Sequence, residues 1–202
     1  MSAFIRAIAP PFFVIKKWRL FIMKNKNSVH RLAFSALIAA IYAALTMALG
    51  FMSYSGVQFR VAEALCVLPF FFPSTAWGLF AGCVIANLLS PAGPLDVVFG
   101  SLATLLCGLS AAALGRGGHH GSWWRCILVC AAPVVFNAVI VGAVIAYMGI
   151  SAGADSAPFA LLWSFYGAQV GIGELLVMFT LGLALIRYLP KMKFYEKIRE
   201  KL

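Results

Sequence analysis

The sequence contains few charged residues. Only 11% of its 202 residues are Asp, Glu, Lys or Arg, and only six of them are acidic, whereas about a quarter of a soluble domain is charged. Hydrophobic residues make up 63% of the chain, and the mean hydropathy is +0.95. This composition excludes a soluble globular protein and predicts an all-α integral membrane protein.

Enzyme motifs are also missing. The sequence has no HExxH, no GxSxG, no Walker phosphate-binding loop and no pair of carboxylates set around a reacting centre. We therefore expect no enzymatic activity, and any ATP hydrolysis would be performed by partner subunits. The cysteines lie in apolar segments without CxxC spacing, so we expect no disulfide, metal site or cofactor; they are Cys66, Cys83, Cys107, Cys126 and Cys130.

The basic residues are confined to a few short segments. Seven of the 16 Lys and Arg lie in residues 1–31, six lie in 187–202, and Arg116 and Arg125 flank a loop. Such clusters between apolar spans place the two termini and this loop in the cytoplasm, by the positive-inside rule. The net charge of +10 does not indicate nucleic acid, because a folded basic surface is absent from the pattern. His119 and His120, in the same loop, are expected to be exposed.

Long apolar runs with few charges predict a bundle of six transmembrane helices. An even number of crossings agrees with the basic termini, which require both ends on one side. We divide the chain into a basic cytoplasmic segment (1–31), in which Met23 is a candidate start, a membrane domain (32–188) and a basic cytoplasmic tail (189–202). The predicted spans cover residues 32–52, 58–72, 75–90, 95–115, 126–149 and 158–187.

Ionisable residues at membrane depth are costly and are therefore candidates for function. Arg60 and Glu63 lie three apart on one helical face, where they either pair with each other or contact a ligand. Asp96 begins the fourth span, where it either caps the helix or contacts a ligand. Glu174 lies deep in the sixth span without a nearby basic residue in sequence, which favours a ligand role.

Neutral polar and aromatic residues extend this set. Asn87 and Asn137 lie within spans, and Trp163, Tyr166 and Gln169 recur at helical spacing along the span that contains Glu174. Such a stripe serves either helix packing or a pocket in which aromatic rings stack on a flat ligand and polar groups bind its edge.

Small residues repeat every four positions in the first span, at Ala36, Ala40, Ala44 and Ala48. This spacing allows another helix to approach closely. The approaching helix belongs either to this protein or to a partner subunit, and the composition alone leaves both readings open.

Three segments carry a resemblance to a known family. They are VQFRVAEALCVLPFFFPSTAWGLFAGCVIANLLSP at 57–91, GPLDVVFGSLATLL at 93–106 and GIGELLV at 171–177. With the R-x-x-E of Arg60 and Glu63, and with Asn87 and Asp96, they resemble the QueT-type family. The likeness covers roughly residues 28–190. The first 22 residues of the chain depart from the pattern, which supports Met23 as a start.

The resemblance implies a substrate-binding S component of an energy-coupling factor (ECF) transporter in a bacterial plasma membrane. Such S components are six-helix bundles that bind a vitamin-like compound from outside, here a queuosine precursor of the deazaguanine type or queuine. They associate with a transmembrane coupling subunit and two ATP-binding-cassette ATPases. In this chain Ala36, Ala40 and Ala44 match the docking motif, and residues 52–59 match the loop that closes over the ligand.

The chemistry of a deazaguanine suits the candidate residues. Glu174 or Glu63 would accept hydrogen bonds from the donor edge of the ring, Asn137 or Asn87 would bind its carbonyl, and Asp96 would balance an aminomethyl cation. Trp163 or Tyr166 would stack on the ring. Three alternatives stay open: an S component for another vitamin, a stand-alone proton-coupled transporter with Glu174 as proton carrier, and a membrane enzyme or assembly protein.

Overall fold

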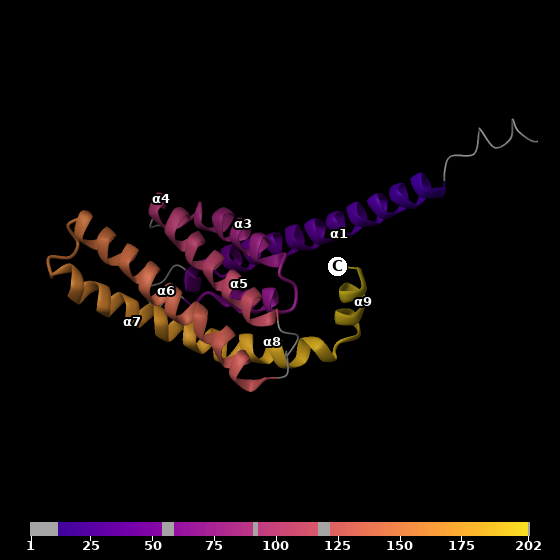
Figure 1. Cartoon of the computed structure of the whole chain (residues 1–202). Coiled ribbons are helices and arrows are strands. Elements are labelled where there is room, and N and C mark those ends of the chain that lie inside the picture. Colours follow the sequence, from indigo (N-terminus) through magenta and orange to yellow (C-terminus); the bar gives the residue numbers. More distant parts are fainter. Residues whose placement is uncertain (1–11, 54–58, 91–92, 117–121, 202) are drawn as a thin grey trace, which may run out of the picture.

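The structure, a computed structural model, describes residues 12–53, 59–90, 93–116 and 122–201, with side chains from residue 28 onward. These ranges are helical and contain no strand, which confirms the all-α prediction. The elements are α1 (Phe12–Ala48), α2 (Gly50–Ser53), η2 (Val61–Phe70), α3 (Thr75–Asn87), α4 (Gly93–Leu95), η3 (Asp96–Gly100), α5 (Ser101–Gly115), α6 (Trp123–Ser151), α7 (Phe159–Val177), η4 (Met178–Gly182), α8 (Leu183–Tyr188), η5 (Leu189–Lys191) and α9 (Lys193–Lys201) (Figure 1).

Four helical stretches in the described part of the chain are long and apolar enough to cross a membrane. They coincide with the predicted first, fourth, fifth and sixth spans. The elements at the second and third positions, η2 and α3, have only 10 and 13 residues, so each is about 20 Å long. The multi-pass helical architecture is confirmed, and six crossings stay a prediction. The four long stretches are Ser28–Ala48, Gly93–Gly115, Trp123–Ser151 and Phe159–Lys191.

The predicted outer boundaries of the membrane domain do not coincide with helix ends. Helix α1 continues through residue 31 without a break, and the predicted tail folds into η5 and the amphipathic helix α9. Residues 1–11 lie outside the described part of the chain. The start at Met23 and the cytoplasmic assignments of both segments stay predictions.

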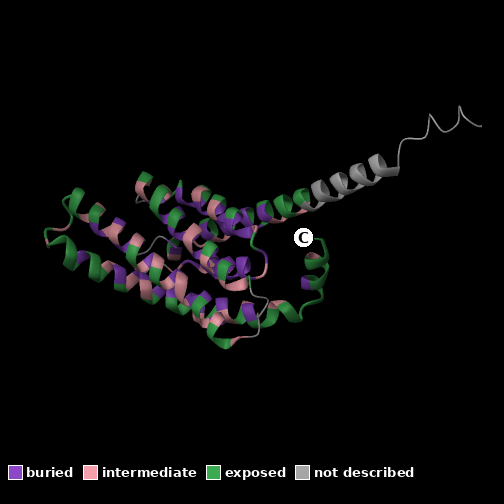
Figure 2. Cartoon of the chain, viewed as in Figure 1, coloured by how far each residue is buried: buried purple, intermediate pink, exposed green. Residues whose placement is uncertain are grey.

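Helix η2 lies inside the bundle. Eight of its ten residues are buried, among them Glu63 and Pro69. A helix that is apolar and buried all round needs neighbours on every side, and η2 packs against α1, α3, α5 and α6. Its side chains contribute to two core clusters, one around Tyr42 and Leu79 and another around Phe70 and Met178. The buried residues follow the interior of the bundle (Figure 2).

Helices α1 and α3 approach each other closely. A Cβ atom added to Gly82 of α3 would lie 2.5 Å from the backbone oxygen of Ala39, and one added to Gly78 would collide with Ser35. The hydroxyl of Ser35 also donates to the backbone oxygen of Ser74 at 2.9 Å. This packing uses the face of α1 that carries Ser35, Ala39 and Ala43, all of which are buried.

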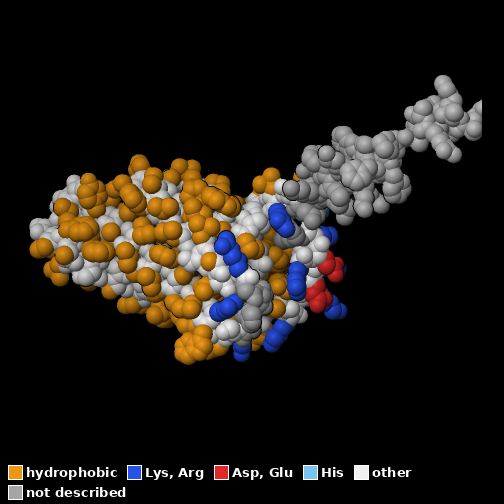
Figure 3. Space-filling model, viewed as in Figure 1, with side chains coloured by type: hydrophobic (Ala, Val, Ile, Leu, Met, Phe, Trp, Pro, Cys, Tyr) orange, Lys and Arg blue, Asp and Glu red, His pale blue; other side chains and the backbone are white. Residues whose placement is uncertain are grey.

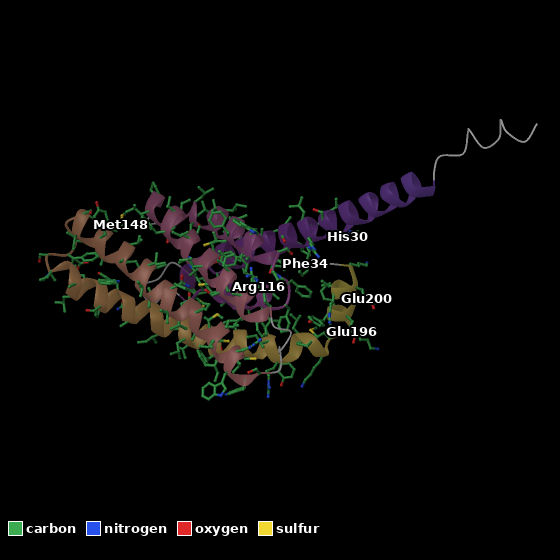
Figure 4. The ribbon with its side chains drawn as sticks, in the orientation of Figure 1. His30, Phe34, Arg116, Met148, Glu196 and Glu200 are labelled. Carbon is green, nitrogen blue, oxygen red and sulfur yellow. The ribbon has the colours of Figure 1, made fainter. Side chains whose placement is uncertain are left out.

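The two ends of the molecule differ in charge. Figure 3 shows Lys and Arg side chains gathered at the end that holds α9, while hydrophobic side chains cover most of the rest of the visible face. The described start of the first span, at His30, lies at the same end, as does Arg116 (Figure 4). The α6–α7 connection lies at the opposite end (Figure 1).

Candidate functional site

Charged groups lie deep within this apolar bundle. Arg60, Glu63, Asp96 and Glu174 are each at most 2% exposed, and they come from the approach to η2, from η2, from η3 and from α7. A buried charge is tolerated only when partners or ligands compensate for the loss of water. The partners of each carboxylate therefore show how far the protein satisfies it.

Glu63 is held by protein donors on both of its carboxylate oxygens. The hydroxyl of Tyr42 donates to Oε1 at 2.5 Å, and that of Thr104 donates to the same oxygen at 3.1 Å. The thiol of Cys66 contacts Oε2 at 2.9 Å. These partners come from α1, α5 and η2, so Glu63 ties three elements together.

Asp96 forms an ion pair with Arg60, with Oδ2 and Nη2 3.2 Å apart. The helix that contains Asp96 begins at Gly93, so the alternative in which Asp96 caps this span is wrong. Asn87 donates from Nδ2 to the backbone oxygen of Asp96 at 2.9 Å. The structure thus brings together three of the predicted site residues, Arg60, Asn87 and Asp96.

Gly100 provides the space for this arrangement. A Cβ atom at residue 100 would lie 2.5 Å from Oδ1 of Asp96 and 2.8 Å from Nδ2 of Asn87. Residues Asp96–Gly100 form a π-helical turn, a local widening of a helix that is frequent at functional sites. Gly100 lies one helical turn after Asp96 in the sequence. A glycine at this spacing from a buried acid could have indicated that the acid needs space on that face of the helix.

Glu174 differs from the other two acids. It hydrogen-bonds the side chain of Asn137 and interacts electrostatically with Glu63 and Arg60. Its Oε2 accepts no hydrogen bond from the described residues. A second π-helical turn, Met178–Gly182, begins four residues later. Glu174 therefore lies beside Asn137, and one of its two carboxylate oxygens has no hydrogen-bond donor among the described residues.

Further polar atoms near these residues also lack donors or acceptors in the described part of the chain. They include Oδ1 of Asn87, Oδ1 of Asp96 and the hydroxyl of Ser101. An unsatisfied buried polar group costs about 1–3 kcal/mol, so a ligand that satisfies several of them would gain affinity. Residue 87 ends α3, and residues 96 and 101 lie near the start of the 93–115 span.

Trp163 and Tyr166, two members of the aromatic stripe of α7, have hydrogen-bond partners in α6 and in the α6–α7 connection. Trp163 donates to the backbone oxygen of Val139 at 3.0 Å and stacks on Phe159. Tyr166 donates to Oδ2 of Asp155, in the α6–α7 connection, at 2.8 Å. Gln169 is half-buried, and no role for it follows from the geometry.

An apolar cavity of about 530 Å³, open to the molecular surface, lies between the start of the 93–115 span, α6 and α7. Two of its residues, Leu95 and Phe99, flank Asp96 in the sequence, and Ile140 follows Asn137 by less than one helical turn. The aromatic members are Phe99, Tyr147, Phe159 and Trp163. Of the predicted site residues, only Trp163 lines this cavity.

Four site residues were not predicted from the sequence. Tyr42, Thr104, Cys66 and Cys83 surround Glu63 and Asn87, with Cys83 Sγ 3.4 Å from Asn87 Nδ2 and 3.3 Å from Thr104 Oγ1. They are single polar side chains within apolar helices, and each carries little signal alone.

Residues 54–58, which make up most of the predicted closing loop, lie outside the described residues. His119 and His120 also lie outside them.

The small-residue stripe of α1 faces outward. Ala36, Ala40 and Ala44 are exposed, whereas Ala39 and Ala43 are buried against the bundle. Packing of the stripe against this protein's own helices is therefore wrong as its explanation. The stripe is accessible to lipid or to another protein.

The sequence was compared with protein families, with curated proteins and with solved structures. The sequence model of the QueT transporter family matches residues 32–191. The chain is 37% identical over 84 residues to the queuosine precursor transporter QueT of Lactococcus lactis subsp. cremoris (strain MG1363). The alignment covers 41% of this chain and 49% of the relative, so the chain spans about half the length of the curated relative it matches. No solved structure matches the chain.

Proposed function

Because the chain belongs to the QueT transporter family, we propose that it is the substrate-binding S component of an ECF-type importer for a queuosine precursor. It would lie in a bacterial plasma membrane with both termini in the cytoplasm. The observation that supports this most is the buried Glu174, which has one carboxylate oxygen with no donor among the described residues, within a bundle that the family match covers.

A deazaguanine supplies the missing hydrogen-bond partners. Its ring presents N–H and NH₂ donors on one edge and a carbonyl acceptor. Glu174 is a better acceptor for the donor edge than Glu63, because Tyr42, Thr104 and Cys66 already contact both oxygens of Glu63. Charged acceptors form the stronger hydrogen bonds, and the adjacent amide of Asn137 would help to orient the ring.

The apolar cavity gives the ring a place to stack. Its volume of about 530 Å³ lies within the usual range of small-molecule sites. Trp163 lies about 16 Å from Glu174 along α7, so a ring bound by Glu174 would contact Phe99 rather than Trp163. Trp163, Phe159 and Tyr147 would contact the substituent of the ligand in the outer part of the cavity. Its inner side lies next to Asp96 and Asn137 in sequence, so a bound ligand would extend from aromatic to polar surroundings.

The open oxygen of Asp96 favours a cationic precursor. Asp96 pairs with Arg60 through Oδ2, and its Oδ1 accepts no hydrogen bond from the described residues. An aminomethyl cation would donate a hydrogen bond to this oxygen. A cyano precursor or queuine would then bind by the same ring contacts, with a different contact at the substituent.

Energy for import would come from partners. The exposed stripe of Ala36, Ala40 and Ala44 suits close approach of a helix from the transmembrane coupling subunit, which would bind two ATP-binding-cassette ATPases.

The experiment that tests this function identifies the ligand directly. Mass spectrometry of small molecules released from the purified protein should detect a deazaguanine, and titration calorimetry should show binding of the aminomethyl form. Uptake by cells should require the coupling subunit and its ATPases. Uptake that persists without these subunits would instead support a proton-coupled transporter, and release of a different vitamin would change the substrate.

A further inference from the structure

A second cavity lies at the basic end of the molecule. It has a volume of about 320 Å³ and forms where the first span, the turn between η2 and α3, and α9 meet. It shares no lining residue with the apolar cavity beside α6 and α7. Its lining residues are Arg31, Phe71, Phe72, Pro73, Ser74, Tyr195 and Arg199.

The inner wall of this cavity is aromatic. Tyr195 contacts Phe71 with ring centroids 5.6 Å apart, and it contacts Phe72 at 5.5 Å. Tyr195 is buried although the rest of α9 is largely exposed. These contacts hold α9 against the bundle and fix the position of Arg199, which lies one turn after Tyr195 on the same helical face.

The rim of the cavity is positive. Arg31 and Arg199 both line it, and the described lining residues include no acid. The two acids of α9, Glu196 and Glu200, lie one position further along and therefore about 100° around the helix. Figure 4 shows them on the side of α9 away from the bundle, and Figure 3 shows acidic side chains at the outer edge of this end.

The surroundings suit the boundary between membrane and cytoplasm. Helix α9 is strongly amphipathic, with Lys193, Lys197 and Lys201 on a helix that also carries Phe194 and Ile198. Phe194 is 59% exposed. Such a helix lies in the headgroup region with its apolar side toward the acyl chains.

We propose that this cavity binds a phosphoryl group, with the guanidinium groups of Arg31 and Arg199 on its oxygens and glycerol or another apolar stem against Phe71, Phe72 and Tyr195. Planar guanidinium groups match phosphate oxygens in pairs. The group comes either from an anionic phospholipid of the inner leaflet or from a soluble phosphate ester. The proposal uses the topology suggested above, and it is independent of the imported substrate.

The test uses the full chain in nanodiscs of phosphatidylcholine that contain a minority of phosphatidylglycerol. Native mass spectrometry should show phosphatidylglycerol retained on the wild-type protein. Arg199→Gln and Arg31→Gln should each lower this retention about fivefold, the usual effect of one basic residue on anionic lipid. Lys197→Gln, which removes a charge from α9 outside the cavity, should change retention less than twofold.

A second arm separates the two sources. If millimolar inorganic phosphate or glycerol 3-phosphate displaces the retained lipid, the cavity accepts soluble phosphates; if only phosphatidylglycerol binds, the ligand is a lipid. Arg199→Lys keeps the charge without the planar fork and should give an intermediate loss, which provides a readout if Arg199→Gln does not fold. Equal losses in Arg199→Gln and Lys197→Gln, or no loss in either arginine variant, would overturn the proposal.

Discussion

Glu63 and Glu174 are equally buried but differently satisfied. Tyr42 and Thr104 donate to Glu63 from positions 21 and 41 residues away in the chain, whereas Glu174 hydrogen-bonds Asn137 and keeps Oε2 without a described donor. Glu63 therefore acts as a structural acceptor that joins helices. Glu174 is the carboxylate with capacity for a ligand.

Glu174→Gln tests this assignment. The amide keeps an oxygen for Asn137 but replaces the open acceptor with an NH₂ donor, which would face the donor edge of a deazaguanine. A hydrogen bond to a charged group contributes about 1.5–3 kcal/mol, so calorimetry should show affinity lower by one to two orders of magnitude. Glu196→Gln, at an exposed position of α9, should leave affinity unchanged. Equal affinities for wild type and Glu174→Gln would exclude Glu174 from ring recognition.

Gly100→Ala tests the packing around Asp96. The added methyl would lie 2.5 Å from Oδ1 of Asp96, so the ion pair with Arg60 must shift, at a cost of about 1–3 kcal/mol. The apparent melting temperature in detergent should fall. Gly171→Ala is the matched control, because its Cβ would meet only Ala138 at 3.4 Å and alanine favours a helix. A similar melting temperature for wild type and Gly100→Ala would show that the site has room to relax.

The sequence predicted which charged residues are buried but not all of their partners. Arg60, Glu63, Asp96 and Glu174 were evident because ionisable groups are rare in apolar helices. The Arg60–Asp96 pair joins positions 36 residues apart, and helical periodicity relates only residues within a few turns. Tyr42 and Thr104 were missed for the same reason, since hydroxyl groups in apolar spans are common and uninformative alone.

At the scale of elements, α1 has one face that packs against α3 and one exposed face of small residues. Ser35, Ala39 and Ala43 pack against α3, and the exposed stripe at Ala36, Ala40 and Ala44 lies beside them. A helix surface that is smooth and not used for internal packing suits association with another helix in lipid, where close van der Waals contact is a main attractive force.

Ala40→Leu is expected to disrupt binding of a coupling subunit. The larger side chain would keep two helices apart while leaving the bundle intact, because Ala40 is exposed. The amount of coupling subunit that co-purifies should fall about tenfold, which corresponds to about 1.4 kcal/mol. Ala168→Leu makes the same change at an exposed position of α7 and should have little effect. Loss of ligand binding in Ala40→Leu, or equal co-purification in both variants, would contradict a docking role.

Helix boundaries were predictable where proline or loop residues interrupt apolar runs. The type of each helix, whether α, 3₁₀ or π, was not predictable. The break at Pro73 was predicted and separates η2 from α3. That η2 forms a 3₁₀-helix buried on nearly all sides depends on neighbours that the sequence does not place. The π-helical turns at Asp96–Gly100 and Met178–Gly182 were likewise not predicted, because DVVFG and MFTLG have no pattern that distinguishes a π-helical turn from an α-helical one.

At the scale of the whole molecule, the charge distribution indicates how the bundle is oriented across a membrane. Basic side chains gather at the end with α9 (Figure 3), where the described parts of both terminal regions and Arg116 meet. The opposite end holds Asp155 in the α6–α7 connection (Figure 1). The four long helices alone would give four crossings. If η2 and α3 each crossed as well, the number would be six. Both numbers are even and would leave the two termini on one side.

This orientation predicts the result of reporter fusions. Lys and Arg near span ends are retained in the cytoplasm, so green fluorescent protein fused after Leu202 should fluoresce. Alkaline phosphatase, which is active only outside, should be active when inserted after Gly153, an exposed turn residue with φ +68° and open space around it. The same enzyme inserted between Arg116 and Arg125 should be inactive. Phosphatase activity at the C-terminus would reverse the orientation, and the aromatic cavity would then face the cytoplasm, where it could not collect a nutrient from outside.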